Sequence, residues 1–177
     1  MATLRILRTA VVLVAATFAI AAPATTAAPT RKASAGALEQ DVLAQVNELR
    51  RQHGLGSVRL SAALGAAAAE HSAEMARRGY FAHDSANGSP FDRRIARYYP
   101  LGGHRYWSVG ENLLWSSPNV DGAGALQMWM ASPEHRKILL TSRWREIGLS
   151  AVHVTAAPGA FKGLEVTIVT ADFGVRR

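Results

Sequence analysis

The apolar residues of this 177-residue chain change their spacing along its length, and this change constrains the fold more than any other feature. Over the first two thirds they recur at steps of three and four, as in Leu38, Val42, Val46 and Leu49, which predicts amphipathic helices. From Ile147 onward they alternate along the chain, which predicts strands. Helices followed by strands, without strand–helix alternation, favour an α+β fold over a parallel sheet.

Capping and turn residues delimit the predicted elements. A first helix covers about 38–53 and ends at Gly54. A second follows Ser61 as its N-cap and stops at Gly79, and a third opens with Ser89 at the N-cap and Pro90 at the first helical position. The chain then holds an extended segment, two short helices and two strands, predicted over about 107–115, 121–131, 132–139, 147–152 and 164–168.

The N-terminus has the pattern of an export signal. Arg5 and Arg8 precede an apolar stretch from Thr9 to Ala22, and Ala22-Pro23-Ala24 supplies small residues for cleavage. The alternative is a permanent membrane anchor, but the stretch is shorter than the roughly 20 residues of a membrane span. We therefore expect a signal peptide over residues 1–28, a flexible leader over 29–36 and one domain over 37–177, secreted from a bacterial cell with the option of staying associated with its envelope.

The absence of cysteine and the net charge limit which kinds of site and which partners we expect. The chain has no cysteine, which excludes disulfides, thiolate metal sites and a cysteine nucleophile. Its formal charge is +7, but the pairs Arg50-Arg51 and Arg77-Arg78 fall at the ends of predicted helices, where cations complement the helix dipole. We therefore expect no nucleic-acid partner, and anionic wall polymers or lipid head groups fit the charge better.

Three polar residues, Glu111, His135 and His83, are the candidate site residues of the sequence. Glu111 lies on the predicted apolar face of the extended segment, together with Trp107, Val109 and Leu113. His135 follows Ser132 near the start of a helix, where the positive helix end favours a neutral imidazole, and His83 lies in a loop. Two imidazoles and a carboxylate form a ligand set for a divalent cation, zinc before calcium or magnesium. A structural Glu111, satisfied by backbone N–H groups or an arginine, is the equal alternative.

Six short motifs follow one another along the chain: His71-Ser72-Ala73-Glu74-Met75-Ala76, Phe81-Ala82-His83, Gly110-Glu111-Asn112-Leu113, Trp129 to Arg136, Glu146-Ile147-Gly148-Leu149 and Asp172-Phe173-Gly174. In kind and order they resemble the CAP superfamily of cysteine-rich secretory, antigen 5 and pathogenesis-related proteins, in particular its bacterial SCP-like branch. The resemblance covers about residues 38–174.

The resemblance implies a three-layer α-β-α sandwich, in which a small antiparallel sheet lies between helical layers. It also implies a cavity whose floor carries two histidines and two acidic residues. His83, Glu111 and His135 match three of these, whereas the fourth position is Ser132, whose hydroxyl is a weaker ligand than a carboxylate. Trp107, Asn112 and Trp129 are expected to line the cavity.

Three functions remain open at this point. The leading one is a secreted binding module with a divalent cation in its cavity and a groove for an apolar or wall-derived ligand; the resemblance implies lipids or sterols among these. The second is a metal-assisted hydrolase that uses Glu111, His83 and His135. No nucleophile supports it, because Ser132 is explained as an N-cap and G-x-S-x-G is absent. The third is a cell-surface interaction protein whose polar cluster is purely structural.

Overall fold

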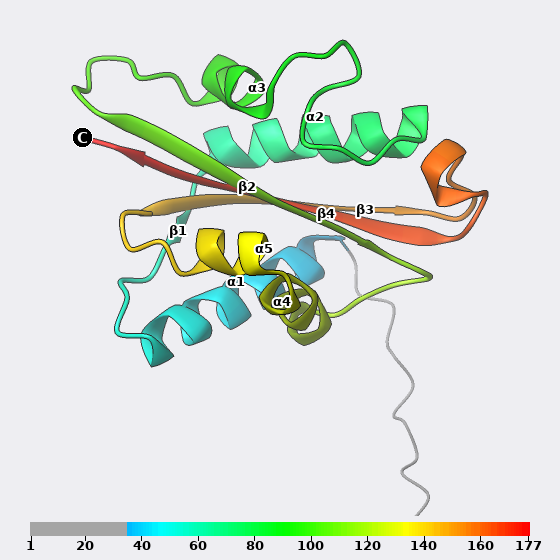
Figure 1. The fold of residues 1–177 in the computed structure, drawn as a ribbon, viewed down its shortest axis with the longest axis horizontal. Helices are drawn as coiled ribbons and strands as arrows, with labels where there is room; N and C mark the ends of the chain where they lie inside the picture. Colours follow the sequence, from blue (N-terminus) through cyan, green and yellow to red (C-terminus); the bar gives the residue numbers. More distant parts are fainter. Residues whose placement is uncertain (1–34) are drawn as a thin grey trace, which may run out of the picture.

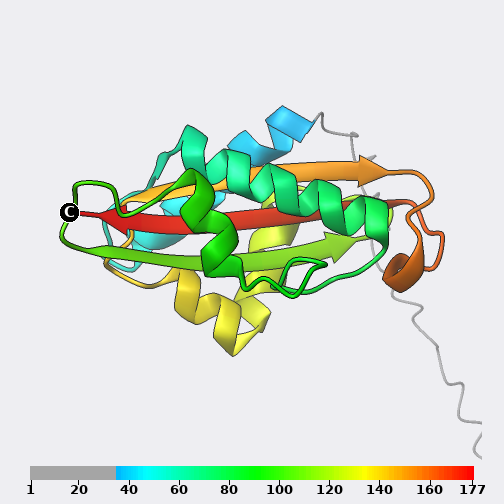
Figure 2. The ribbon, with the colours of Figure 1, turned by 90° about the horizontal axis from the view of Figure 1, so that it is seen from above.

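A four-stranded sheet separates two layers of helices in the computed structural model, which describes residues 35–177 (Figure 1). The helices α2 (Ala62–Arg78) and α3 (Phe91–Tyr98) cover one face. The other face is covered by α1 (Ala35–Gln52), α4 (Gly122–Ala131) and α5 (Pro133–Leu139). The view onto the first layer shows α2 running along the strands while α3 crosses them (Figure 2). The predicted α+β sandwich is confirmed, and the predicted signal peptide lies outside the described residues.

The strands occur in the order β1-β3-β4-β2, which leaves β2 at one edge of the sheet. Their bounds are Arg59–Leu60 for β1, Trp107–Ser116 for β2, Glu146–Val154 for β3 and Val166–Arg176 for β4. The pairs β2–β4 and β3–β4 are antiparallel, as predicted, and a 3₁₀ turn, Gly159–Phe161, lies between β3 and β4. The sheet is mixed rather than purely antiparallel, because β1 pairs in parallel with β3. A two-residue strand is too short to show alternation in the sequence.

The strand β2 divides its side chains between the two layers, as the predicted alternation requires. Trp107 and Val109 pack with the cluster of Leu64, Ala67, Ile95 and Tyr99 under α2 and α3. Leu114 belongs instead to the larger core that α1, α4 and α5 form on the opposite face. Glu111 lies on the same face of β2 as Trp107 and Val109, and it is 4% exposed. Its predicted burial is therefore confirmed.

The helix ends follow the predicted caps with three corrections. Ser61 accepts a hydrogen bond from Leu64 N at 3.4 Å and Gly79 has φ 71°, as expected for an N-cap and a C-cap. The helix α1 begins at Ala35, three residues earlier than predicted. The helix α3 begins one residue later, with Pro90 rather than Ser89 at the N-cap. Ser132 holds the N-cap position of α5, but its side chain makes no capping hydrogen bond, because this residue also ends α4.

Among the helices of residues 35–177, none combines the length and the apolar character that crossing a membrane requires.

Candidate functional site

A cleft of about 370 Å³ opens beside the edge strand β2. Its walls come from the loop before α3, from β2 itself, and from α5 with the segment after it; the lining residues are His83, Phe91, Glu111, Asn112, Glu134, His135, Lys137, Ile138 and Arg143. The structure thus brings His83, Glu111, His135 and Asn112 to one place. Trp107, Trp129 and Ser132 do not line this cleft. The indole of Trp107 instead donates to Tyr99 O at 2.7 Å.

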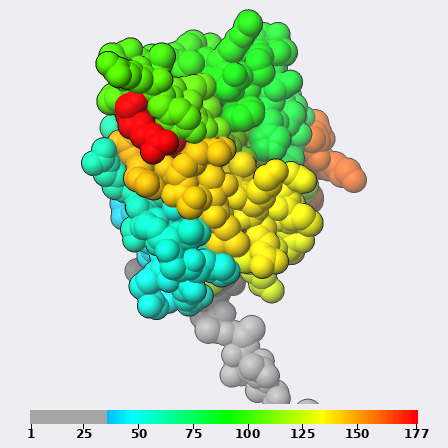
Figure 3. Space-filling model, turned by 60° about the vertical axis from the view of Figure 1, so that its left-hand side comes forward, coloured from blue at the N-terminus to red at the C-terminus, as the bar shows by residue number. Residues whose placement is uncertain are grey.

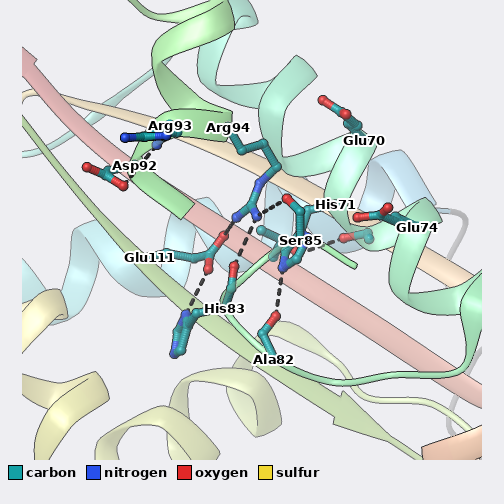
Figure 4. A network of polar contacts seen from close by, with 12 residues as sticks. Glu70, His71, Glu74, Ala82, His83, Ser85, Asp92, Arg93, Arg94 and Glu111 are labelled. Atoms are coloured by element: carbon teal, nitrogen blue, oxygen red, sulfur yellow. Dashed lines mark hydrogen bonds and ion pairs between the residues drawn. The ribbon is translucent and has the colours of Figure 1, made fainter. Parts of the chain in front are cut away.

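Glu111 is held from both sides at the floor of the cleft. His83 Nδ1 lies 2.7 Å from Glu111 Oε1, and Arg94 donates to Glu111 Oε2 (Figure 4). Arg94 is 1% exposed and Glu111 4%, whereas the His83 side chain is 49% exposed. An ion pair this deep is costly to form but more costly to break, because either partner alone would be an uncompensated buried charge.

Arg94 is a site residue that the sequence analysis missed. Its guanidinium also donates to His83 O at 3.0 Å and to Ser85 Oγ at 3.2 Å, so it ties the loop that carries His83 to the sheet. Phe91, Ile95 and Tyr99 recur at steps of four along α3 and its C-cap, and Arg94 follows Phe91 by three residues. That spacing places Arg94 on the inner side of the helix and could have identified it as a partner for a buried carboxylate.

A second carboxyl lies directly opposite Glu111. Asp172 of β4 pairs with Glu111 in the strand register and is fully buried. Burial, and secondly the charge of Glu111, raise the pKa of Asp172 well above its usual value. Two acidic groups and the cation Arg94 therefore lie together behind the cleft, and the raised pKa of Asp172 favours its protonated form. From the sequence, Asp172 was expected only as part of the motif Asp172-Phe173-Gly174.

The loop that carries His83 is also fixed from α2. His71 is fully buried, as expected for the inner face of α2, and its Nε2 donates to Ala82 O at 2.9 Å. Burial lowers the pKa of His71, so its imidazole is neutral and can donate through one nitrogen only. Tyr80 donates to Glu74 Oε2 at 2.7 Å one turn further along α2. The position of His83 therefore depends on α2 as well as on α3.

Two histidine rings line the cleft, one on the loop before α3 and one on α5. Burial and the nearby His83 lower the pKa of His135, which keeps its imidazole neutral at pH 7. His83 Nδ1 faces the Glu111 carboxylate, so this nitrogen carries a proton and donates to Oε1. Asn112 adds an acceptor to the cleft: its Nδ2 donates to His135 O at 3.1 Å, while its buried Oδ1 has no partner within the described chain.

The expected three-ligand metal set is not assembled in this arrangement. Within residues 35–177, no group of three or more His, Cys, Asp or Glu side chains has the geometry of a metal site. Both oxygens of Glu111 are engaged, one with His83 and one with Arg94. Glu111 thus stands behind His83 as a hydrogen-bonding partner, an arrangement common around metal-binding histidines. The donors that remain for a cation are the imidazoles of His83 and His135.

Two further cavities adjoin the cleft. One, of about 220 Å³, shares His135 and is otherwise apolar; it is lined by Phe81, Leu113, Leu114, Trp115, Met128 and Trp129, so Trp129 lines this cavity rather than the cleft. The other, of about 400 Å³, shares Lys137 and lies against the side chains of Met130, Ala131, Pro133, Arg136 and Leu140. The polar cleft therefore continues into apolar space on either side of His135 and Lys137.

Comparisons with known proteins agree with the motifs. Residues 43–173 match the model of the CAP, or cysteine-rich secretory protein, family. The uncharacterized protein YkwD of Bacillus subtilis is 31% identical over 129 residues, 72% of this chain and 46% of that protein. The uncharacterized membrane protein YlbC of the same organism is 30% identical over 112 residues, 63% of this chain and 30% of that protein. The chain thus spans less than half the length of these relatives.

Solved structures show the same fold. An extracellular protein with an SCP domain from Bacillus anthracis superposes with a TM-score of 0.60 at 26% identity, over 81% of this chain and 41% of that one. An outer surface protein of Borrelia burgdorferi superposes with a TM-score of 0.58 at 17% identity, over 78% of this chain and 92% of that one, and shows the likeness of fold alone.

Proposed function

Because the chain belongs to the CAP family, we propose that it is an extracellular binding module whose cleft beside β2 takes an amphipathic ligand. An extracellular location is supported by the pattern of residues 1–28 and by the similarity to an extracellular SCP-domain protein. The polar part of the ligand occupies the cleft, and its apolar part occupies the adjoining cavity around Trp115 and Met128. Lipids, sterols and wall-derived fragments with an apolar end belong to this class.

The unpartnered oxygen of Asn112 carries this proposal. Asn112 lines the cleft and its amide oxygen is buried without a donor, so a ligand that supplies an O–H or N–H group as the side chain turns toward the cleft recovers the missing hydrogen bond. The neutral imidazole of His135 adds an acceptor along the same cleft. A ligand with hydroxyl or amide donors therefore suits this end, and Lys137 and Arg143 on the same cleft offer cations to an acidic group.

The hydrolase alternative gains no support from the site. The imidazole of His135 is free to take a proton from water, but the hydrolase alternative also assigns catalytic work to Glu111 and needs a nucleophile. Glu111 is engaged by Arg94 and His83, and Ser132 lines none of the three cavities. The third alternative, a purely structural polar cluster, accounts for the Glu111–Arg94 pair, because this pair holds the loop and the sheet together. It gives no role to the Asn112 oxygen or to the adjoining apolar cavity.

Ligand binding is expected to raise the midpoint of thermal unfolding of the full chain. We would titrate two probes separately, cholesterol in a mild detergent and N-acetylmuramyl dipeptide. The probe that binds should stabilise the fold by about 2.7 kcal/mol at 100 times its Kd. Asn112→Leu, similar in size but without the acceptor, should weaken binding by at least tenfold. Asn119→Leu, outside the cleft, serves as the matched control. If neither probe shifts the midpoint, or if Asn112→Leu binds like the wild type, the proposal fails.

A divalent cation is a separable part of the proposal, held by the imidazoles of His83 and His135. Nitrogen donors favour zinc over calcium or magnesium, and the ion would place a positive charge in the cleft. After treatment with EDTA, added zinc is expected to raise the unfolding midpoint, and calcium and magnesium are not. The shift should be lost in His135→Ala and kept in His104→Ala, an exposed histidine outside the cleft. A zinc shift that survives in His135→Ala would show that the ion binds elsewhere.

A further inference from the structure

One end of the sheet gathers segments that are far apart in the sequence. Residues 59–60, 99–107, 143–147 and 174–177 meet there and are called the arginine end below. Arg59 pairs with Glu146 in the strand register, Arg145 N donates to Gly174 O at 3.1 Å, and Arg105 N donates to Arg177 O at 2.9 Å. The space-filling view shows these segments side by side on one face, with the C-terminal residues in red (Figure 3).

The arginine end carries a strong positive charge. Its four segments hold six arginines and one carboxylate, Glu146. That carboxylate is already engaged, because it accepts hydrogen bonds from Arg59 at 3.1 Å and from the Tyr99 hydroxyl. Arg105, Arg143, Arg145 and Arg177 are all exposed. This face is therefore complementary to a surface of negative charge.

Exposed apolar side chains lie among these arginines. Leu60 is 47% exposed, Leu101 45% and Tyr106 36%. The segment that presents two of them is held firmly: Tyr106 N donates to Arg177 O at 2.8 Å, and Arg177 N donates to Tyr106 O at 3.1 Å. The Arg177 guanidinium also lies 4.9 Å from the centre of the Tyr106 ring. Leucine and tyrosine side chains are thus presented in a fixed position next to cations.

We propose that the arginine end docks on a bilayer that contains anionic lipids. The arginines bind the head-group phosphates, while Leu101 and Tyr106 enter the interfacial region, where an aliphatic chain and an amphipathic ring both lower their free energy. A soluble polyanion would use the arginines but would leave the apolar side chains in water. Arg143 belongs both to this end and to the cleft, so docking would bring the mouth of the cleft next to the membrane.

Vesicle sedimentation with the full chain tests this docking. Vesicles of phosphatidylcholine with one third phosphatidylglycerol are expected to bind the protein much more tightly than vesicles of phosphatidylcholine alone. Each arginine replaced should weaken binding about fivefold, so Arg105→Gln/Arg177→Gln should bind about 25-fold more weakly. Leu101→Ser should also weaken binding severalfold, since it removes apolar area from the interface.

A matched control comes from the opposite end of the sheet, after the 3₁₀ turn. Leu164 is 43% exposed and stands near Lys162, so Leu164→Ser/Lys162→Gln changes the same kinds of side chain and should bind like the wild type. Because all variants share residues 1–34, their differences report on the arginine end alone. Equal binding to neutral and anionic vesicles would overturn the proposal. So would unchanged binding of Leu101→Ser combined with full competition by soluble polyphosphate, which would identify an anionic polymer instead.

Discussion

Arg94→Met is expected to destabilise the fold by about 3–5 kcal/mol, the usual cost of removing one partner of a buried ion pair. The substitution keeps most of the aliphatic stem but leaves Glu111 and Asp172 side by side without a cation. It also removes the donors to His83 O and Ser85 Oγ, so the loop over the cleft loses its tie to the sheet. Urea unfolding of the full chain, followed by circular dichroism, measures the loss.

Two further variants test whether the loss of stability comes from the buried ion pair of Arg94 and Glu111. Arg97→Met removes another arginine of α3, one that forms an exposed pair with Glu70 at 2.7 Å, and should cost no more than about 1 kcal/mol. Glu111→Gln should cost less than Arg94→Met, because Asp172 lies opposite and can release its proton to become the counterion of Arg94. If Arg94→Met loses no more stability than Arg97→Met, the pair does not hold the site together.

The sequence predicts which side chains are buried in this site better than it predicts their partners. Alternation along β2 places Glu111 on the inner face with Trp107 and Val109, and the structure confirms that face. The contact with Arg94 depends on how α3 lies across β2, which no local periodicity contains. The pairing of Glu111 with Asp172 depends likewise on the register of β2 against β4, strands separated by two helices and a third strand.

The differences at element ends have local causes. Ser132 was expected to cap α5 with its side chain, but one residue that closes α4 and opens α5 has its geometry set by both helices. The strand β1 exists because residues 59–60 pass β3 on their way into α2, and two residues carry no pattern. The three-layer sandwich, in contrast, was implied by the resemblance that the motifs carry, and the structure confirms it.

Gly148→Ala is the second substitution with a large expected effect. A Cβ at this position would lie 2.0 Å from the Leu64 carbonyl carbon and 2.2 Å from Gly65 N, so the backbone of α2 itself blocks it. Leu64 is fully buried and α2 rests directly on β3 here, so the helix has to move away from the sheet. We expect a loss of more than about 4 kcal/mol, at the upper end of single substitutions.

Gly65→Ala is the matched control from the other side of the same contact. Its Cβ would enter open space in the first turn of α2, where alanine is favoured over glycine by up to about 1 kcal/mol, so stability should stay level or rise. Thermal unfolding of both variants measures the contrast, and equal midpoints would show that α2 can shift at little cost. The site depends on this contact, because α2 carries His71, which holds Ala82 next to His83. A Gly148→Ala protein that still folds should therefore bind its cleft ligand more weakly than Gly65→Ala does, although position 148 touches no residue of the cleft.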